Sequence, residues 1–190
     1  MKKLVEIYCL SDNFVKLIDK KNPKTNVGRP GLLSKSCYIT LTIFKNTLGI
    51  KTNRQLYEFT KEHLKSEFPN LPSYQQFNEG IRSCFKYFIC IMYLLMRSNR
   101  DKQSNIHFVD STILPVCKPI RMLQVKLFNK LARKSKTTMG WFYGFKLHLI
   151  INKNMEIETI KIATHDLNVL NDDFLDGIIG WLVGDRRIFK

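Results

Sequence analysis

The sequence predicts an α/β protein with a helical N-terminal half and a C-terminal half that mixes strands with a helix. Up to about residue 100, apolar residues recur every three or four positions between helix start and stop signals. After the polar connector 97–104 their spacing changes to two, which is typical of strands. Two of the expected strands, 106–116 and 180–188, each carry an aspartate, Asp110 and Asp185.

The charge of the chain points to an anionic partner. Of its 190 residues 44% are hydrophobic, and 31 lysines and arginines against 16 acidic residues give a net charge of +15. A chain this apolar can fold, so disorder does not explain the charge. A surplus of this size repels itself unless a polyanion is the usual partner. Nucleic acid is the first candidate, an acidic membrane surface the second, and a basic ribosomal protein a further alternative.

The five cysteines favour a reduced, cytoplasmic protein. Their number is odd, and no two have the spacing of a zinc knuckle. The most apolar run, residues 87–96, is about half as long as a membrane span and is expected to be a buried helix. Polar residues interrupt the N-terminus before a signal-peptide core can form, so no membrane partner is expected.

Residues 1–100 are expected to form a bundle of about four helices, which begins with a short amphipathic helix or helix pair over 4–21. Three helix N-caps are predicted at Ser34, Thr52 and Ser73. The last two are each followed three residues later by glutamine, which is the spacing of a capping box. Glycine at position 49 is expected to close the first of these helices.

Two features make residues 1–100 a candidate DNA-binding region. The helix–turn–helix pattern over 35–65 could read DNA, although any antiparallel helical hairpin has the same pattern. In the loop 22–31, Gly28-Arg29-Pro30 is similar to the hook that some proteins place in the minor groove, with a plain turn as the alternative.

The C-terminal half is expected to contain a hairpin of strands 143–152 and 156–164, then a helix over 167–179 and the buried strand 180–188. In the first hairpin strand, odd-numbered apolar residues share one face, and Lys146 and His148 lie on the other. These two side chains could contact DNA near a scissile phosphate, or they could belong to an exposed strand face.

The sequence allows two interpretations of Asp110. An isolated Asp-Ser-Thr is typical of an aspartate that ends a strand by capping its own turn. Against this, no carboxylate occurs between Asp110 and Glu156, whereas nine lysines and arginines do. An uncompensated basic block beside an acid is typical of a phosphate backbone held across a metal site. The candidate DNA-binding residues are Arg29, Lys126, Lys130, Arg133, Lys134, Lys136, Lys146 and His148.

Five motifs, in this order along the chain, resemble the catalytic domain of DDE transposases, in particular that of insertion sequence family 982, which small bacterial mobile elements carry. They are Phe-Val-Asp-Ser-Thr at 108–112, Leu-Pro-Val-Cys at 114–117, the block 137–148 ending in Lys-Leu-His, His-Asp at 165–166, and Gly-Asp-Arg at 184–186. The N-terminal text also resembles that family.

The resemblance implies that residues 101–190 form a ribonuclease-H-like catalytic domain in which two aspartates and one glutamate bind two Mg²⁺ or Mn²⁺ ions. By the motifs, the catalytic and metal-binding aspartates are Asp110 and Asp185. Two metal ions help to deprotonate the nucleophile and stabilise charge on the leaving oxygen. The glutamate of the family lies on a later helix, but only five residues follow Asp185 and none is acidic. We therefore expect an α/β chain with an incomplete catalytic domain, truncated before the third carboxylate.

The function that the resemblance implies is metal-dependent DNA strand cleavage and strand transfer of an insertion sequence, catalytically incomplete in this chain. The expected partners are the terminal repeats of the element and its target DNA, with a homodimer as one option for assembly. The alternative is a non-catalytic DNA-binding fragment that acts as a repressor of transposition.

Overall fold

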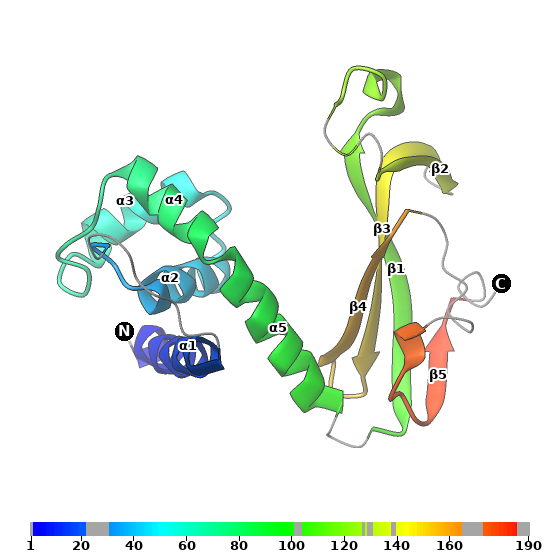
Figure 1. Cartoon of the computed structure of the whole chain (residues 1–190), viewed down its shortest axis with the longest axis horizontal. Coiled ribbons are helices and arrows are strands. Elements are labelled where there is room, and N and C mark those ends of the chain that lie inside the picture. The colour runs from blue at the N-terminus through cyan, green and yellow to red at the C-terminus, as the bar shows by residue number, and fades with distance from the viewer. Residues whose placement is uncertain are drawn as a thin grey trace. The chain divides into compact units, whose positions relative to one another are not determined.

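The computed structural model describes residues 2–21, 31–100, 104–126, 128, 131–137, 140–164 and 173–185. The chain divides into two compact units, residues 1–93 and 94–190. Helices make up the first unit, and the second is built on a five-stranded mixed sheet, so the predicted α/β class is confirmed (Figure 1). All five cysteines are free, and none of the helices in the described residues is long and apolar enough to cross a membrane.

Five helices precede residue 101, where about four were expected. They are α1 (Lys2–Lys21), α2 (Lys35–Thr47), α3 (Asn53–His63), α4 (Tyr74–Ser83) and α5 (Phe85–Arg100). The extra helix arises because the apolar stripe that begins in α4 does not continue as one helix. The chain breaks at Cys84, whose backbone N–H turns back to the carbonyl of Ile81.

The predicted N-caps are confirmed. The Ser34 hydroxyl accepts a hydrogen bond from the backbone N–H of Cys37 at the start of α2. Thr52 and Ser73 each form a complete capping box with the glutamine three residues later. Gly49, just beyond α2, has φ +69°, a left-handed conformation that glycine adopts without strain.

The core of the first unit joins α2, α3 and α4. Ile39, Leu41, Leu56 and Phe77 are fully buried in it. α5 contributes only Tyr87 and Ile91 as buried side chains, whereas its Ile89, Tyr93 and Leu95 are exposed. The expectation that residues 87–96 form a buried helix is therefore wrong, because α5 is amphipathic and buries only one face.

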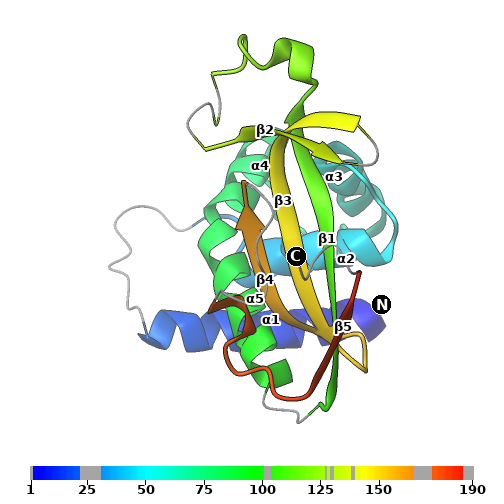
Figure 2. The same ribbon diagram turned by 90° about the vertical axis from the view of Figure 1, so that its right-hand side faces the viewer.

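In the second unit the central strand is β3 (Gly140–Asn152), which pairs along both edges (Figure 2). One edge pairs antiparallel with β1 (Ile106–Cys117). The other pairs antiparallel first with β2 (Arg133–Thr137) and then with β4 (Ile157–Ala163). The short strand β5 (Trp181–Gly184) runs parallel to β1 along its free edge.

The hairpin of β3 and β4 confirms the predicted pair of strands. β2 was not predicted, because its sequence Arg-Lys-Ser-Lys-Thr has no apolar alternation. Of the helix expected over 167–179, residues 167–172 lie outside the described part, and the rest contains the short 3-10 helix η3 (Asp173–Leu175). The expectation of a buried last strand is wrong, since Trp181 at its start is 78% exposed.

The core of the second unit lies on the face of β3 that was expected to be exposed. Val109 of β1 and Ile150 of β3 pair across the sheet and pack against Phe174 of η3. His148 lies on this same face of β3, two residues from Ile150, and is also buried. Both faces of β3 carry apolar residues, and the Phe174 segment selects the even-numbered face for the core.

The entry into β5 depends on Gly180, which has φ +134°. A Cβ there would lie 2.5 Å from the carbonyl oxygen of Asn105, which accepts the hydrogen bond of the Trp181 N–H. Gly177 also has a positive φ, +77°, but a Cβ there would meet nothing within 4 Å. A substitution at Gly177 therefore introduces backbone strain alone, whereas a substitution at Gly180 introduces strain and a steric clash.

We expect Gly177→Ala to lower the free energy of unfolding of the second unit by about 1 kcal/mol, and Gly180→Ala by roughly 3 kcal/mol, because strain and clash add there. Both tryptophans of the chain lie in this unit, so urea unfolding followed by tryptophan fluorescence measures the difference. Equal losses in the two variants would show that the contact with Asn105 does not hold β5 in place.

Candidate active site

The register between β1 and β5 places the two predicted catalytic aspartates at the same level of the sheet. The parallel pairs run from Ile106 with Trp181 to Val109 with Gly184. Asp110 and Asp185 each follow the last pair directly, and both are exposed. Neighbouring strands lie about 4.8 Å apart. Two aspartates that are 75 positions apart in the sequence are thus at the same level of the sheet.

Asp110 lies in the middle of a strand and does not end it. It pairs with Leu149 of β3, and β1 continues as far as Cys117. The interpretation of Asp110 as the cap of a turn at the strand end is therefore wrong. One carboxylate oxygen, Oδ1, accepts a hydrogen bond of 2.7 Å from the backbone N–H of Ser111.

The Asp110–Asp185 pair fits a small oxygen donor set for a divalent ion. Mg²⁺ is commonly held by one or two carboxylates, while water and a substrate phosphate supply its other ligands. Within the ranges that the structure describes, no three His, Cys, Asp or Glu side chains gather into a metal site. The described residues therefore offer two carboxylates at this position.

The basic residues of the second unit extend from the other end of the sheet. On β2, Arg133, Lys134 and Lys136 are all exposed, as is Lys126 in the segment before it. The ammonium groups of Lys134 and Lys136 lie 4.8 Å and 5.8 Å from the centroid of the Trp141 ring on β3. Of the remaining predicted DNA-binding residues, Arg29 and Lys130 lie outside the described residues.

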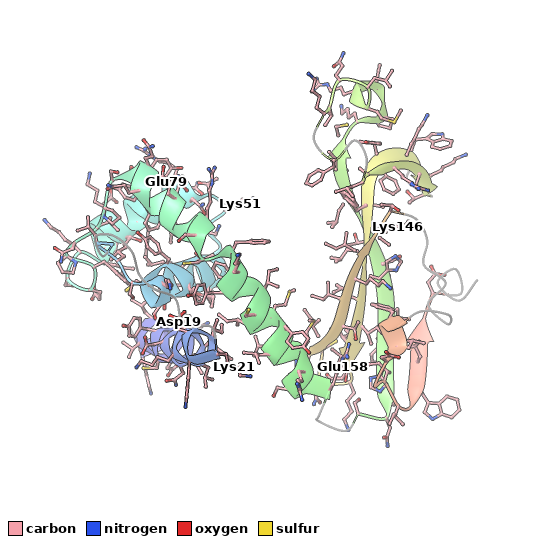
Figure 3. All side chains as sticks on the ribbon, in the orientation of Figure 1. Asp19, Lys21, Lys51, Glu79, Lys146 and Glu158 are labelled. Carbon is pink, nitrogen blue, oxygen red and sulfur yellow. The ribbon has the colours of Figure 1, made fainter. Side chains whose placement is uncertain are left out.

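Lys146 and His148 do not lie on the exposed strand face that was expected for them. Lys146, labelled on β3 in Figure 3, is half-buried. His148 is only 2% exposed, and its ring packs edge-on against Phe174 at a centroid distance of 6.2 Å. Direct contact between His148 and DNA is incompatible with this burial, so the prediction for His148 is corrected.

Residues 100–189 match the family model of the transposase DDE domain. The matched range includes all five strands and both aspartates. It supports a DDE transposase family for this chain. No curated protein and no solved structure matches the chain.

Within the matched range the structure shows a buried pair that was not predicted from the sequence, His107 of β1 and Glu158 of β4. The Nδ1 atom of His107 lies 2.6 Å from Oε2 of Glu158, and its Nε2 lies 3.2 Å from the carbonyl oxygen of Ile179 (Glu158 is labelled in Figure 3). Both side chains are almost completely buried. The sequence did contain a signal for this pair, because His107 and Glu158 are ionisable residues near the start of two largely apolar strands.

The geometry of this pair requires an extra proton. Each nitrogen of the His107 ring faces an oxygen acceptor, so either the ring carries two protons or the Glu158 carboxyl carries one. Burial by itself lowers the pKa of His107. The hydrogen bond to Glu158 and the backbone contacts of Ile179 and Ser104 act in the opposite direction and prevail, so the pKa is raised above its ordinary 6.5.

The raised pKa gives a stability prediction with a definite sign. A group whose pKa is higher in the folded state stabilises fully below its unfolded pKa, and this contribution is lost as the pH rises through the folded pKa. We therefore expect the free energy of unfolding of the second unit to fall as the pH rises above about 6.5. Glu158→Gln should lower it by about 1–3 kcal/mol at pH 6 and reduce this pH dependence.

Denaturant unfolding followed by tryptophan fluorescence at several pH values measures both effects. The control is His63→Gln, because His63 is exposed and lies in the first unit. A pH dependence that is identical in the wild type and in Glu158→Gln would contradict the assignment to the buried pair.

Proposed function

We propose that this chain carries the metal-dependent DNA cleavage and strand-transfer site of a bacterial insertion sequence, of family 982, on a ribonuclease-H-like domain over residues 101–190. The observation that carries the proposal is the parallel register that puts Asp110 beside Asp185. The match to the transposase DDE domain and the strand order β4–β3–β1–β5, with only β5 parallel to β1, support it.

In this proposal Asp110 and Asp185 hold Mg²⁺ or Mn²⁺. A divalent ion between two such carboxylates and a phosphate supplies electrophilic activation of the phosphodiester and favours deprotonation of the attacking hydroxyl or water. The Ser111 N–H donates a hydrogen bond to Oδ1 of Asp110 and so restrains the orientation of this carboxylate, which would hold the ion together with Asp185. Asp110 lies within β1, and Asp185 directly follows the last residue that β5 pairs with β1.

The basic residues hold the DNA backbone in this proposal. Arg133, Lys134 and Lys136 are exposed on β2, and Lys126 is exposed nearby, with no acidic residue between positions 111 and 155. Each phosphate that they neutralise releases bound counterions, so binding should weaken steeply with salt. Arg29, Lys130 and Lys146 complete the proposed DNA-binding set, and residues 1–100 are the proposed DNA-binding region of the chain.

A second candidate is a non-catalytic DNA-binding protein that represses transposition, active in the cytoplasm like the first. One observation favours it: the described residues bring no third carboxylate to Asp110 and Asp185. Both candidates share the basic surface and the partner DNA, including a homodimer as one form of assembly. They differ in whether strand cleavage occurs.

A cleavage assay separates the two candidates. The substrate is a supercoiled plasmid carrying the sequences that flank the gene for this chain, incubated with Mg²⁺ or Mn²⁺. We expect nicking to fall at least about hundredfold in Asp110→Asn and in Asp185→Asn, because each change removes one negative ligand, while DNA binding changes little. Asp176→Asn, an exposed aspartate of the same unit, should leave nicking unchanged.

Two other outcomes have clear meanings. Salt-sensitive binding of the plasmid without nicking by the wild type would favour the repressor. Binding that does not weaken between low and high salt would rule out the phosphate-binding surface and with it both candidates.

A further inference from the structure

Trp141 is an exposed aromatic residue in the most basic part of the second unit. It lies near the start of β3. This end of β3 is at the opposite end of the sheet from β5 (Figures 1 and 2). Its side chain is 57% exposed, although an indole of this size is normally mostly buried. Fold stability alone therefore does not account for a tryptophan at this position.

The face of the Trp141 ring is approached by lysines. Lys136 pairs directly with Trp141 across the hairpin, and Lys134, two residues away, lies on the same face of β2. Their ammonium groups stand 5.8 Å and 4.8 Å from the ring centroid, within cation–π range. Lysine side chains are long and flexible, so the two ammonium groups can move aside at low cost and a flat group can stack on the Trp141 ring.

The chemistry of this cluster selects its ligand. A flat aromatic ring with two cations beside it matches a nucleobase with a phosphate on either side, and no acidic side chain between positions 111 and 155 opposes a polyanion. In a duplex each base face is covered by its neighbours. Only an unpaired or unstacked base presents a free face to an indole ring.

We propose that Trp141, Lys134 and Lys136 form a binding site for an unpaired nucleotide of a DNA strand. The indole of Trp141 stacks on the base, and the two lysines neutralise the phosphates on either side. The inference rests on the proposed function and adds to it the structural state of the DNA that the hairpin of β2 and β3 recognises.

Fluorescence tests the stacking directly. The chain has two tryptophans, so Trp181→Phe leaves Trp141 as the only reporter. A single strand of about ten thymidines should quench this fluorescence strongly, and a duplex of the same length should quench it weakly. Absence of preferential quenching by the single strand would overturn the inference.

Affinity measurements supply the matched variants. Trp141→Ala should weaken binding of the single strand by about five- to hundredfold, whereas Trp141→Phe should retain most of the affinity. Both should leave duplex binding within about twofold, because the duplex offers no base face. Trp181→Ala removes the other exposed tryptophan and should change neither. Equal losses for single strand and duplex in Trp141→Ala would overturn stacking on a base.

The lysines have a separate signature. For the single strand, Lys134→Gln combined with Lys136→Gln should reduce the slope of log affinity against log salt by about 1.4, and Trp141→Ala should leave that slope unchanged. If the wild type binds duplex DNA in a salt-sensitive way but Trp141→Ala has no effect on the single strand, only this inference fails. If no DNA binding depends on salt, the proposed function fails first.

Discussion

The hydrogen bonds of the buried His107 ring join three segments that are far apart in the sequence. One ring nitrogen faces Glu158 of β4, and the other faces the carbonyl of Ile179, which lies just before β5. A buried imidazole and a buried carboxylate each lose hydration on folding, and only mutual satisfaction offsets that cost. The segment leading into β5 is therefore fixed to β1 by a polar contact as well as by the backbone pairs. The position of Asp185 beside Asp110 depends on both.

The parts of the fold that could be predicted are those determined locally. Ser34, Thr52 and Ser73 start helices because each side chain satisfies N–H groups within its own turn, and the sequence contains all partners of that interaction. The β3–β4 hairpin could be predicted for the same reason. The core-facing side of β3 could not, because both of its faces are apolar and the choice is made by Phe174, a residue 24 positions beyond Ile150.

The candidate site divides in the same way. Asp110 and Asp185 could be proposed from motifs, but their proximity follows from a parallel register that no short stretch of sequence encodes. The role of Trp141 depends on β2, a strand whose polar sequence forms only because β3 extends beyond β4 and offers it an edge. His148 is a case in which a local pattern gave a wrong prediction. The alternation of apolar residues predicted an exposed position, whereas packing against Phe174 buries the ring.

The uninterrupted course of β3 has a consequence for how DNA could lie on this domain. Trp141 and Leu149, the strand partner of Asp110, are eight residues apart on β3. At about 3.3 Å per residue the strand separates the two levels by at most about 26 Å. This distance corresponds to about eight steps of a duplex, in which a strand advances about 3.4 Å per nucleotide, and to fewer steps of an extended unpaired strand. The length of β3 therefore sets the distance between the two aspartates and the proposed nucleotide-binding site at Trp141.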